Sequence, residues 1–370
     1  MSRQNSSLPR KIFSEIERKF GAPIKGDLLL TSVGTLGSPY VVKPGERFYF
    51  KDGNLTWFRH FQELDSKFLY YWLVSPQGKA ELQKCTIGSS QSAFTIVLLK
   101  GMEIELPPLP AQRRIAGILS AYDELIENNQ RRIRILEDMA RSLYREWFVH
   151  FRYPGHDSPR PQAGEGLGVR AGFVDSPLGQ IPQGWEVLEF RSVFEIKYGK
   201  TLPKTEISES GQYPVYGAGD VIGYYDKLLY PQKCALVTSR GNGSGTVWRT
   251  RGAAFVTNNS LIITPQKQVY YWSYPFIELL LKHSNVMAAK TGSAQPQVTI
   301  ENLSYVQAIV PPRGLVEKFC AYATPMYEQV DSLFEQTANL RRTRDLLLPR
   351  LLSGQVAMKI QDSELDEVTP

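Results

Sequence analysis

The sequence has few cysteines and histidines and no long apolar run. Its three cysteines, Cys85, Cys234 and Cys320, are widely separated among 370 residues, so we expect neither a disulfide framework nor a Cys-x-x-Cys metal pair. The four histidines form no His-x-x-x-His pair, which argues against structural zinc. No apolar run approaches the roughly 18 residues of a membrane helix, and the first residues lack a signal-peptide core. We therefore expect a cytoplasmic protein with no membrane partner and no metal site.

The usual motifs of nucleotide, acyl-transfer and dinucleotide chemistry are also missing. The sequence contains no P-loop, no Gly-x-Ser-x-Gly elbow and no Gly-x-Gly-x-x-Gly after a strand. One enzyme-like fragment is Glu195-Ile196-Lys197, a Glu-x-Lys of the kind that helps to hold metal in many nucleases, with Asp175 as a distant candidate carboxylate. Such tripeptides are common by chance, and a solvated strand end is the favoured interpretation. We expect no catalytic residue, and a stand-alone metal-dependent DNA nuclease is kept as an alternative.

Acidic residues are absent from one long stretch of a mildly basic chain. The whole sequence has 43 Lys and Arg against 37 Asp and Glu, whereas residues 227 to 277 contain six Lys or Arg and no acid. This pattern predicts a basic face, although polar loops beside a β core would give it too. Short polar side chains interleaved with the cations can bond bases or phosphates. The candidate DNA contacts here and at the turn that follows are Lys233, Ser239, Arg240, Asn242, Arg249, Arg251, Lys290, Ser293 and Gln295.

The sequence does contain a long internal repeat. Gly88-Ser89-Ser90-Gln91 is matched by Gly292-Ser293-Ala294-Gln295, and Pro107-Pro108 by Pro311-Pro312, both 204 residues later. Two further matches keep the same order at offsets of 207 and 200 residues, namely 30 to 32 with 237 to 239 and 70 to 72 with 270 to 272. The order predicts a duplicated architecture. The first copy offers a thinner set of candidate DNA contacts, which are Lys25, Thr31, Ser32, Ser89 and Gln91.

Each copy ends in a long amphipathic segment with a heptad repeat. The predicted seam positions are Ile115, Tyr122, Asn129, Leu136 and Leu143 in the first segment and Phe319, Met326, Leu333, Leu340 and Leu347 in the second. The phase is the same in both copies, as a helix–helix seam requires. A helix of about 39 residues is a rod of roughly 58 Å, too long to lie on one small domain. Two amphipathic helices packed on separate cores are the alternative.

These features predict an α+β fold with two mixed α/β heads joined by a pair of long coiled-coil helices. The expected layout is a first head over 1–109, a helix over 110–152, a Pro- and Gly-rich linker over 153–180, a second head over 181–312, a helix over 313–354 and a disordered acidic tail over 355–370. Heads separated by such rods would lie more than one duplex turn of about 34 Å apart. We therefore expect a two-part DNA target with unlike halves. A bivalent DNA-binding scaffold or regulator is a further alternative.

Four motifs in a fixed order resemble a known family. They are LPPLPAQRRI at 106–115, IPQGW at 181–185, VPP at 310–312 and RDLLLPRLLSG at 344–354, and their order is similar to that of the specificity subunits of type I restriction-modification enzymes. The resemblance implies two target-recognition domains, an antiparallel pair of helices, and a bipartite asymmetric site on double-stranded DNA. It implies as partners two methyltransferase subunits that use S-adenosylmethionine, and restriction subunits that translocate and cut DNA with ATP and Mg. The chain itself would bind no cofactor.

The first copy departs from the pattern at its N-terminal side. It has no counterpart of Ile181–Trp185, and at an offset of 207 residues about 27 residues are missing before the first match. We therefore expect the first target-recognition domain to be shortened, which puts its recognition of DNA in question.

Overall fold

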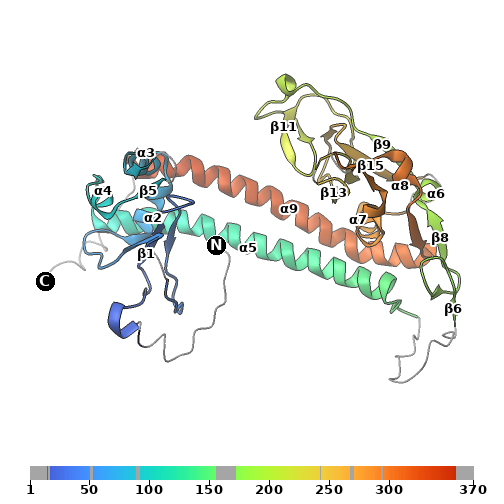
Figure 1. Ribbon diagram of the computed structural model, residues 1–370, viewed down its shortest axis with the longest axis horizontal. Helices are drawn as coiled ribbons and strands as arrows, with labels where there is room; N and C mark the ends of the chain where they lie inside the picture. The colour runs from blue at the N-terminus through green and yellow to red at the C-terminus, as the bar shows by residue number, and fades with distance from the viewer. Residues whose placement is uncertain are drawn as a thin grey trace. The chain divides into compact units, whose positions relative to one another are not determined.

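The computed structural model describes residues 15, 17–50, 53–88, 92–155, 172–241, 243–266, 271–292 and 295–355. The chain divides into two compact units (Figure 1). The first lies within residues 1–129 and 336–370 and the second within 130–335. Both long helices therefore contribute to both units. The predicted acidic tail lies almost wholly outside the described residues, as does 156–171 of the predicted linker.

The first unit contains a small antiparallel sheet followed by helices. Strand β1 (Leu28–Thr31) lies between β2 (Pro39–Val41) and β3 (Leu55–Phe58). The remaining elements of this head are α2 (Ser66–Val74), α3 (Pro76–Lys84), the hairpin of β4 (Thr86–Ile87) and β5 (Ala93–Phe94), and α4 (Ile96–Lys100). Leu28 and Leu30 of β1 are buried against Trp72 and Leu73 of α2. The apolar run of β1 thus forms the centre of this core.

The second unit contains two larger sheets. The four-stranded sheet has the order β13 (Val247–Arg249), β12 (Ala235–Thr238), β15 (Ser260–Pro265) and β9 (Phe194–Tyr198), with antiparallel neighbours. The three-stranded sheet has the order β11 (Val221–Tyr225), β10 (Tyr213–Tyr216) and β14 (Phe255–Val256). Two further strand pairs are β6 (Phe173–Val174) with β7 (Ile181–Pro182), and β8 (Glu186–Glu189) with β18 (Gln307–Val310).

Short helices complete the second head. They are α6 (Phe190–Val193), η2 (Lys204–Glu206), α7 (Tyr274–His283), η4 (Val286–Ala289) and α8 (Ile300–Ser304). Between η4 and α8 lies a hairpin of β16 (Lys290–Thr291) and β17 (Gln297–Val298). Both heads therefore mix helices and strands, as the sequence predicts.

The backbone confirms the internal repeat. The match of 70–72 with 270–272 is not part of it, because 70–72 lie inside α2 whereas 271 and 272 precede α7. The segment from β4 through β5 and α4 recurs as β16, β17 and α8, each 204 residues later. The carbonyl of Ser32, just after β1, accepts a hydrogen bond from the amide of Phe94 (3.0 Å), and the carbonyl of Ser239, just after β12, accepts one from Val298 (2.7 Å). Thr95 and Thr299 cap α4 and α8 by accepting from the third amide along. The two copies therefore share hydrogen bonds and not only element order.

The two long helices are antiparallel within each unit. Helix α5 (Leu109–Tyr144) continues as a π-helical turn, η1 (Arg145–Val149), and α9 spans Arg313–Leu352. In the first unit Ile115 and Leu119 of α5 cluster with Leu348 and Leu351 near the end of α9. In the second unit Ile133 of α5 clusters with Val330 and Leu333 near the middle of α9.

The seam has two positions per heptad, of which the sequence analysis identified one. Among the predicted positions Ile115, Asn129, Phe319 and Leu333 are buried, and Tyr122, Leu136, Leu143, Met326, Leu340 and Leu347 are half-buried. The second position, offset by three or four residues, is occupied by the buried residues Leu119, Ile126, Ile133, Ala140, Ala323, Val330, Thr337 and Leu351. Alternating spacings of three and four residues are those of a heptad seam. Several members are Ala or Thr, which an apolar heptad pattern does not mark.

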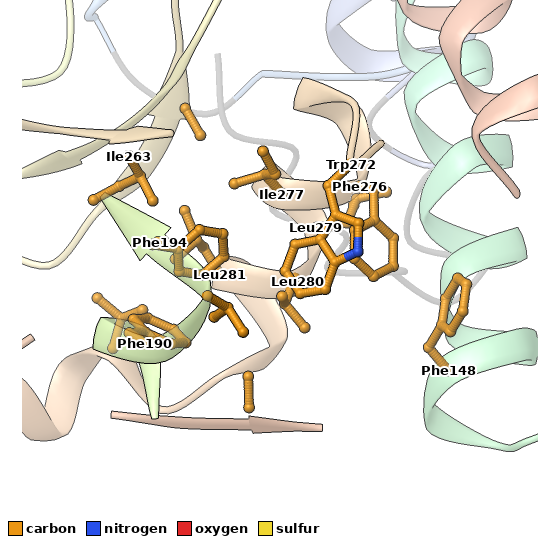
Figure 2. Packing of buried hydrophobic residues seen from close by; sticks show 14 of the residues in the cluster. Phe148, Phe190, Phe194, Ile263, Trp272, Phe276, Ile277, Leu279, Leu280 and Leu281 are labelled. Atoms are coloured by element: carbon orange, nitrogen blue, oxygen red, sulfur yellow. The ribbon is translucent and has the colours of Figure 1, made fainter. Parts of the chain in front are cut away.

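The core of the second unit joins its head to both long helices (Figure 2). Helix α7 presents Phe276, fully buried, toward Phe148 of η1, with ring centroids 5.2 Å apart. Phe319 of α9 lies 5.1 Å from the same Phe148 ring. Large buried aromatic side chains contribute strongly to such packing.

None of the described helices is both long and apolar enough to cross a membrane.

Candidate nucleic-acid interface

A repeated feature, here named the strand-end junction, places several candidate residues side by side. It consists of residues 31–33 with hairpin β4–β5 in the first head, and of residues 238–240 with hairpin β16–β17 in the second. Bridges join Val33 to Ala93 and Arg240 to Gln297. The strand end and the second strand of the hairpin, distant in sequence, are therefore neighbours in both heads.

The junction of the second head carries exposed polar side chains. Arg240 is exposed beside β17, Gln295 is exposed just before that strand, and Lys290 is half-buried at the start of β16. Asn242 and Ser293, also candidates, lie outside the described residues. The cations and the amide can contact phosphates and base edges. This hairpin and strand end therefore form the candidate nucleic-acid interface of the second head.

Buried hydroxyl groups lie behind this surface. Ser239 is almost fully buried, and its hydroxyl donates to the carbonyl of Val298 (2.8 Å), so it holds the hairpin to the strand end. The hydroxyls of Thr238, Ser244 and Thr257 are buried without a hydrogen-bond partner among the described residues. Buried polar groups without a partner are uncommon, and water or a ligand can supply one. The sequence analysis did not single out Thr238 or Thr257, because an isolated threonine in a strand carries no motif.

Two predicted DNA contacts instead belong to a buried ion cluster, defined as Lys233, Arg249, Glu278 and Asp331. Arg249 Nη1 lies 2.6 Å from Asp331 Oδ1, and its Nε lies 3.0 Å from Glu278 Oε2, with all three side chains nearly buried. Lys233 donates to the other oxygen of Asp331 (2.7 Å). Desolvation acts to lower the pKa of Arg249, but attraction to Glu278 and Asp331 outweighs it and raises that pKa. Both basic side chains thus face acids of α7 and α9.

This cluster corrects the expectation of a uniformly basic face. The acid-free stretch ends at residue 277, and Glu278 follows at once in α7, while Asp331 comes from α9. The charges of Lys233 and Arg249 are not unopposed as that expectation had them, because their acidic partners lie outside the sequence window. Arg251 is exposed, but its guanidinium lies over the ring of Phe334 on α9, 3.6 Å from the centroid. Arg251 therefore also packs against the helix.

The first head places its candidates differently. Lys25 is exposed in the turn before β1. The hydroxyl of Thr31 accepts from the amide of Ser38 (2.9 Å) and donates to the carbonyl of Thr35. The hydroxyl of Ser32 is buried 2.6 Å from that of Thr56. These two hydroxyls hold local structure, and Ser89 and Gln91 lie outside the described residues.

The enzyme-like fragment has a simple placement. Glu195 and Lys197 lie on β9, exposed, and form an ion pair of 2.6 Å with each other. This hydrogen bond raises the pKa of Lys197. Asp175 accepts from Gln180 instead. Within the described part of the chain, no three His, Cys, Asp or Glu residues gather in a way that could hold a metal ion.

Comparison with known proteins places this architecture in a family. A family model described as the type I restriction modification DNA specificity domain matches residues 11–138 and again 182–314. The chain belongs to this family. The two matches fall on the two copies of the repeat, so the type I specificity domain occurs twice in one chain.

Relatives in the type I specificity family match most of the chain. It is 26% identical over 364 residues to the type I restriction enzyme MjaIX specificity subunit of Methanocaldococcus jannaschii, covering 90% of this chain and 78% of that relative. It is 22% identical to the type I restriction enzyme HindI specificity subunit of Haemophilus influenzae, covering 78% and 77%. The crystal structure of a type I restriction-modification S subunit from M. genitalium matches with a TM-score of 0.62 at 21% identity, covering 89% and 83%. That likeness supports the fold.

Proposed function

We propose that this chain is the non-catalytic DNA-recognition subunit of a type I restriction-modification system. It reads a bipartite asymmetric site on double-stranded DNA, one half with each head. The observation that carries the proposal is the double match to the type I DNA specificity domain, which falls on two heads with the same strand-end junction. Because the heads differ in sequence at the junctions, the two half-sites differ as well.

The catalytic groups belong to partner subunits in this proposal. Two methyltransferase subunits use S-adenosylmethionine to methylate adenine, and restriction subunits use ATP and Mg to translocate and cut DNA. This chain determines the DNA sequence at which the partner subunits act, and it binds none of these cofactors. The assembly works on DNA in the cytoplasm.

The DNA contacts of the second head lie along its strand-end junction. Arg240 and Gln295 are exposed there and Lys290 is half-buried. Asn242 and Ser293, which are close to them in sequence, belong to the same proposed set. The cations bind phosphates or guanine edges, and the amides bind adenine edges. Lys233 and Arg249 act as structural residues because Glu278 and Asp331 already pair with them. In the first head we assign the contacts to Lys25 and to the turn that contains Ser89 and Gln91.

Co-expression with a type I methyltransferase subunit in a methylation-free host tests the proposal. Genome-wide mapping of methylated adenine should give a split motif with unlike halves around a constant spacer. Failure to form any complex with the methyltransferase subunit contradicts the assignment. A stable complex without methylation contradicts recognition by both heads.

A variant pair locates the contacts. Arg240→Ala should lower methylation at the native site by roughly tenfold or more, since one good base or phosphate contact is worth about 1–3 kcal/mol. Lys318→Ala removes a charge that is also exposed, from α9, and should leave methylation unchanged. Equal loss in both variants would mean that Arg240 acts through bulk charge and not through a contact.

A further inference from the structure

The second unit contains a cavity that shares no residue with the strand-end junction. Its walls come from the end of α5, η1, the end of α7, η4 and the chain around α8 and β18. The cavity has a volume of about 680 Å³, which lies within the ordinary range of small-molecule sites. The proposed recognition of DNA uses none of the residues that line it, so this cavity is without an assigned role.

The walls of the cavity are aromatic, aliphatic and uncharged. Aromatic rings come from Tyr144, Phe148 and Phe151 and from the exposed Tyr305. The remaining polar side chains are amides, one serine and one histidine, and none of the described lining residues is Asp, Glu, Lys or Arg. A charged ligand would lose its hydration there without gaining a counter-ion from the walls. The lining therefore suits an uncharged, flat molecule that carries hydrogen-bonding groups.

Tyr144 supplies a hydrogen-bond donor at the wall. Its side chain is buried, at 3% exposure, and its hydroxyl has no hydrogen-bond partner within the described part of the chain. Burial alone raises the pKa of this hydroxyl, so it keeps its proton. The hydroxyl of a buried tyrosine usually finds a partner. A ligand in the cavity can provide the partner that the chain does not.

His283 supplies an acceptor beside that donor. Its ring lies against the ring of Tyr144, with centroids 4.7 Å apart. His283 Nδ1 lies 2.8 Å from the carbonyl oxygen of Leu279, and a carbonyl can only accept, so Nδ1 carries the hydrogen. Partial burial lowers the pKa of His283, which keeps the imidazole neutral at pH 7. Its Nε2 therefore holds a lone pair.

The backbone at one wall is irregular. Segment η1 is a π-helical turn, and Phe151, two residues beyond it, has a φ of +57°. Both conformations are uncommon for such residues and are found often at functional sites. Phe148 belongs to the same turn (Figure 2) and also lines the cavity. The irregular backbone thus carries two of the aromatic rings of the wall.

We propose that this cavity binds an uncharged purine nucleoside of the adenosine type. The base stacks on the aromatic walls, an interaction that every nucleobase can make. Its exocyclic amino group donates to Nε2 of His283, and a ring nitrogen accepts from the hydroxyl of Tyr144. The amides of Asn285 and Gln307 line the same cavity and bond the remaining edges of the base or the sugar, as amide side chains do with adenine.

Calorimetric titration of the full chain with two nucleosides tests the proposal. Adenosine should bind saturably, with a dissociation constant on the order of 0.1 mM for a ligand of this size. Purine riboside lacks the exocyclic amino group and should bind about fivefold more weakly, because Nε2 of His283 is then left without a donor. In His283→Phe the two nucleosides should bind alike.

Matched variants locate the site. Ala288→Trp adds a large ring at an exposed position of the cavity wall and should abolish saturable binding. Ala80→Trp makes the same change at an exposed position of α3 in the first unit and should leave binding unchanged. Tyr144→Phe removes only the hydroxyl and should weaken the binding of adenosine about fivefold.

Any of three results overturns the proposal. The first is the absence of saturable adenosine binding, and the second is equal affinity of the native chain for adenosine and purine riboside. The third is adenosine binding that survives Ala288→Trp. None of these measurements involves DNA or a methyltransferase subunit, so their failure and the failure of the proposed function are distinguishable.

Discussion

In the second head Arg249 lies buried between Glu278 and Asp331, whereas in the first head the acid that matches Asp331 is Glu127, which forms an exposed pair with Lys43 at 3.6 Å. The side chains of Lys43 and Glu127 are more than half exposed. Those of Arg249, Glu278 and Asp331 are 7% exposed or less. The repeat thus preserves an acid at one site on each long helix. It does not preserve the burial of that acid, which decides how much its ion pair contributes to stability.

The first head has its own polar connection to the helices of its unit. Asp123 of α5 accepts a hydrogen bond from the hydroxyl of Tyr71 (2.7 Å) and pairs with Arg344 of α9. Burial, followed by the bond to Asp123, raises the pKa of Tyr71. The residue that matches Asp123 in α9 is Tyr327, which lies under the guanidinium of Arg249 at 4.8 Å. Each head is therefore attached at equivalent helix positions by different side chains.

The largest expected effect tests whether the two cores are equivalent. Phe68 and Phe276 are the third residues of α2 and α7 and are both fully buried. Phe68→Ala and Phe276→Ala should each lower the free energy of unfolding of their own unit by about 3–5 kcal/mol. Denaturant titration followed by hydrogen exchange measures each unit separately. A loss of stability in one unit only would show that the two buried rings contribute unequally to the stability of their units.

The next prediction separates buried from exposed ion pairs. Asp331→Ala leaves Lys233 without its carboxylate and Arg249 with Glu278 alone. It should therefore lower the free energy of unfolding by about 3 kcal/mol. The matching change Glu127→Ala removes an exposed pair and should cost less than about 1 kcal/mol. The same denaturant titration compares them. Equal small costs would mean that water reaches Asp331 readily.

A pH-dependent difference should arise from Cys234. Burial raises the pKa of its thiol to about 11 from a usual 9.0, partly offset by the bond to Thr250. The folded state holds this proton more tightly than the unfolded state. The stabilisation is therefore complete below pH 9 and is lost as pH rises toward 11, by on the order of 2 kcal/mol.

Cys234→Ala provides the control for that pH dependence. Unfolding of the second unit at pH 9 and at pH 10.5 should differ more in the native chain than in the variant. An identical pH dependence in both proteins would assign the effect to other groups.

The smallest prediction concerns the two helix caps. Thr95 and Thr299 accept hydrogen bonds of 3.2 Å from Leu98 and Asn302. Thr95→Ala and Thr299→Ala should each lower the stability of the capped helix by about 1 kcal/mol. The loss should appear as faster local hydrogen exchange in α4 or α8. Thr→Ser at either position keeps the acceptor and should restore protection. A cost at only one cap would break the equivalence of the two copies.

The sequence predicts the duplication, the mixed heads and the long helices because each leaves a local mark. Repeated tetrapeptides, a heptad phase and alternating turns are visible without a structure. The second seam position also has apolar members, such as Leu119, Ile126 and Val330, which the heptad spacing could have identified. Only Ala140, Ala323 and Thr337 lack a large apolar side chain, so their burial follows from helix geometry.

The candidate contacts could be predicted less well than the fold. Arg240 is exposed as expected, but Arg249, only nine residues later, is buried. Their difference depends on Glu278 and Asp331, which lie 29 and 82 residues beyond Arg249. Counting charges along a stretch of sequence considers only neighbours in the chain, whereas a buried ion pair depends on which strand faces which helix.

The most direct test of two separate recognition heads is an exchange. Residues 181–312 would be replaced by the matching segment of another member of the family, and methylated adenines would be mapped across a genome in cells that also supply the methyltransferase subunit. The account predicts that one half of the split motif changes and the other half stays. A change in both halves, or in neither, would contradict it.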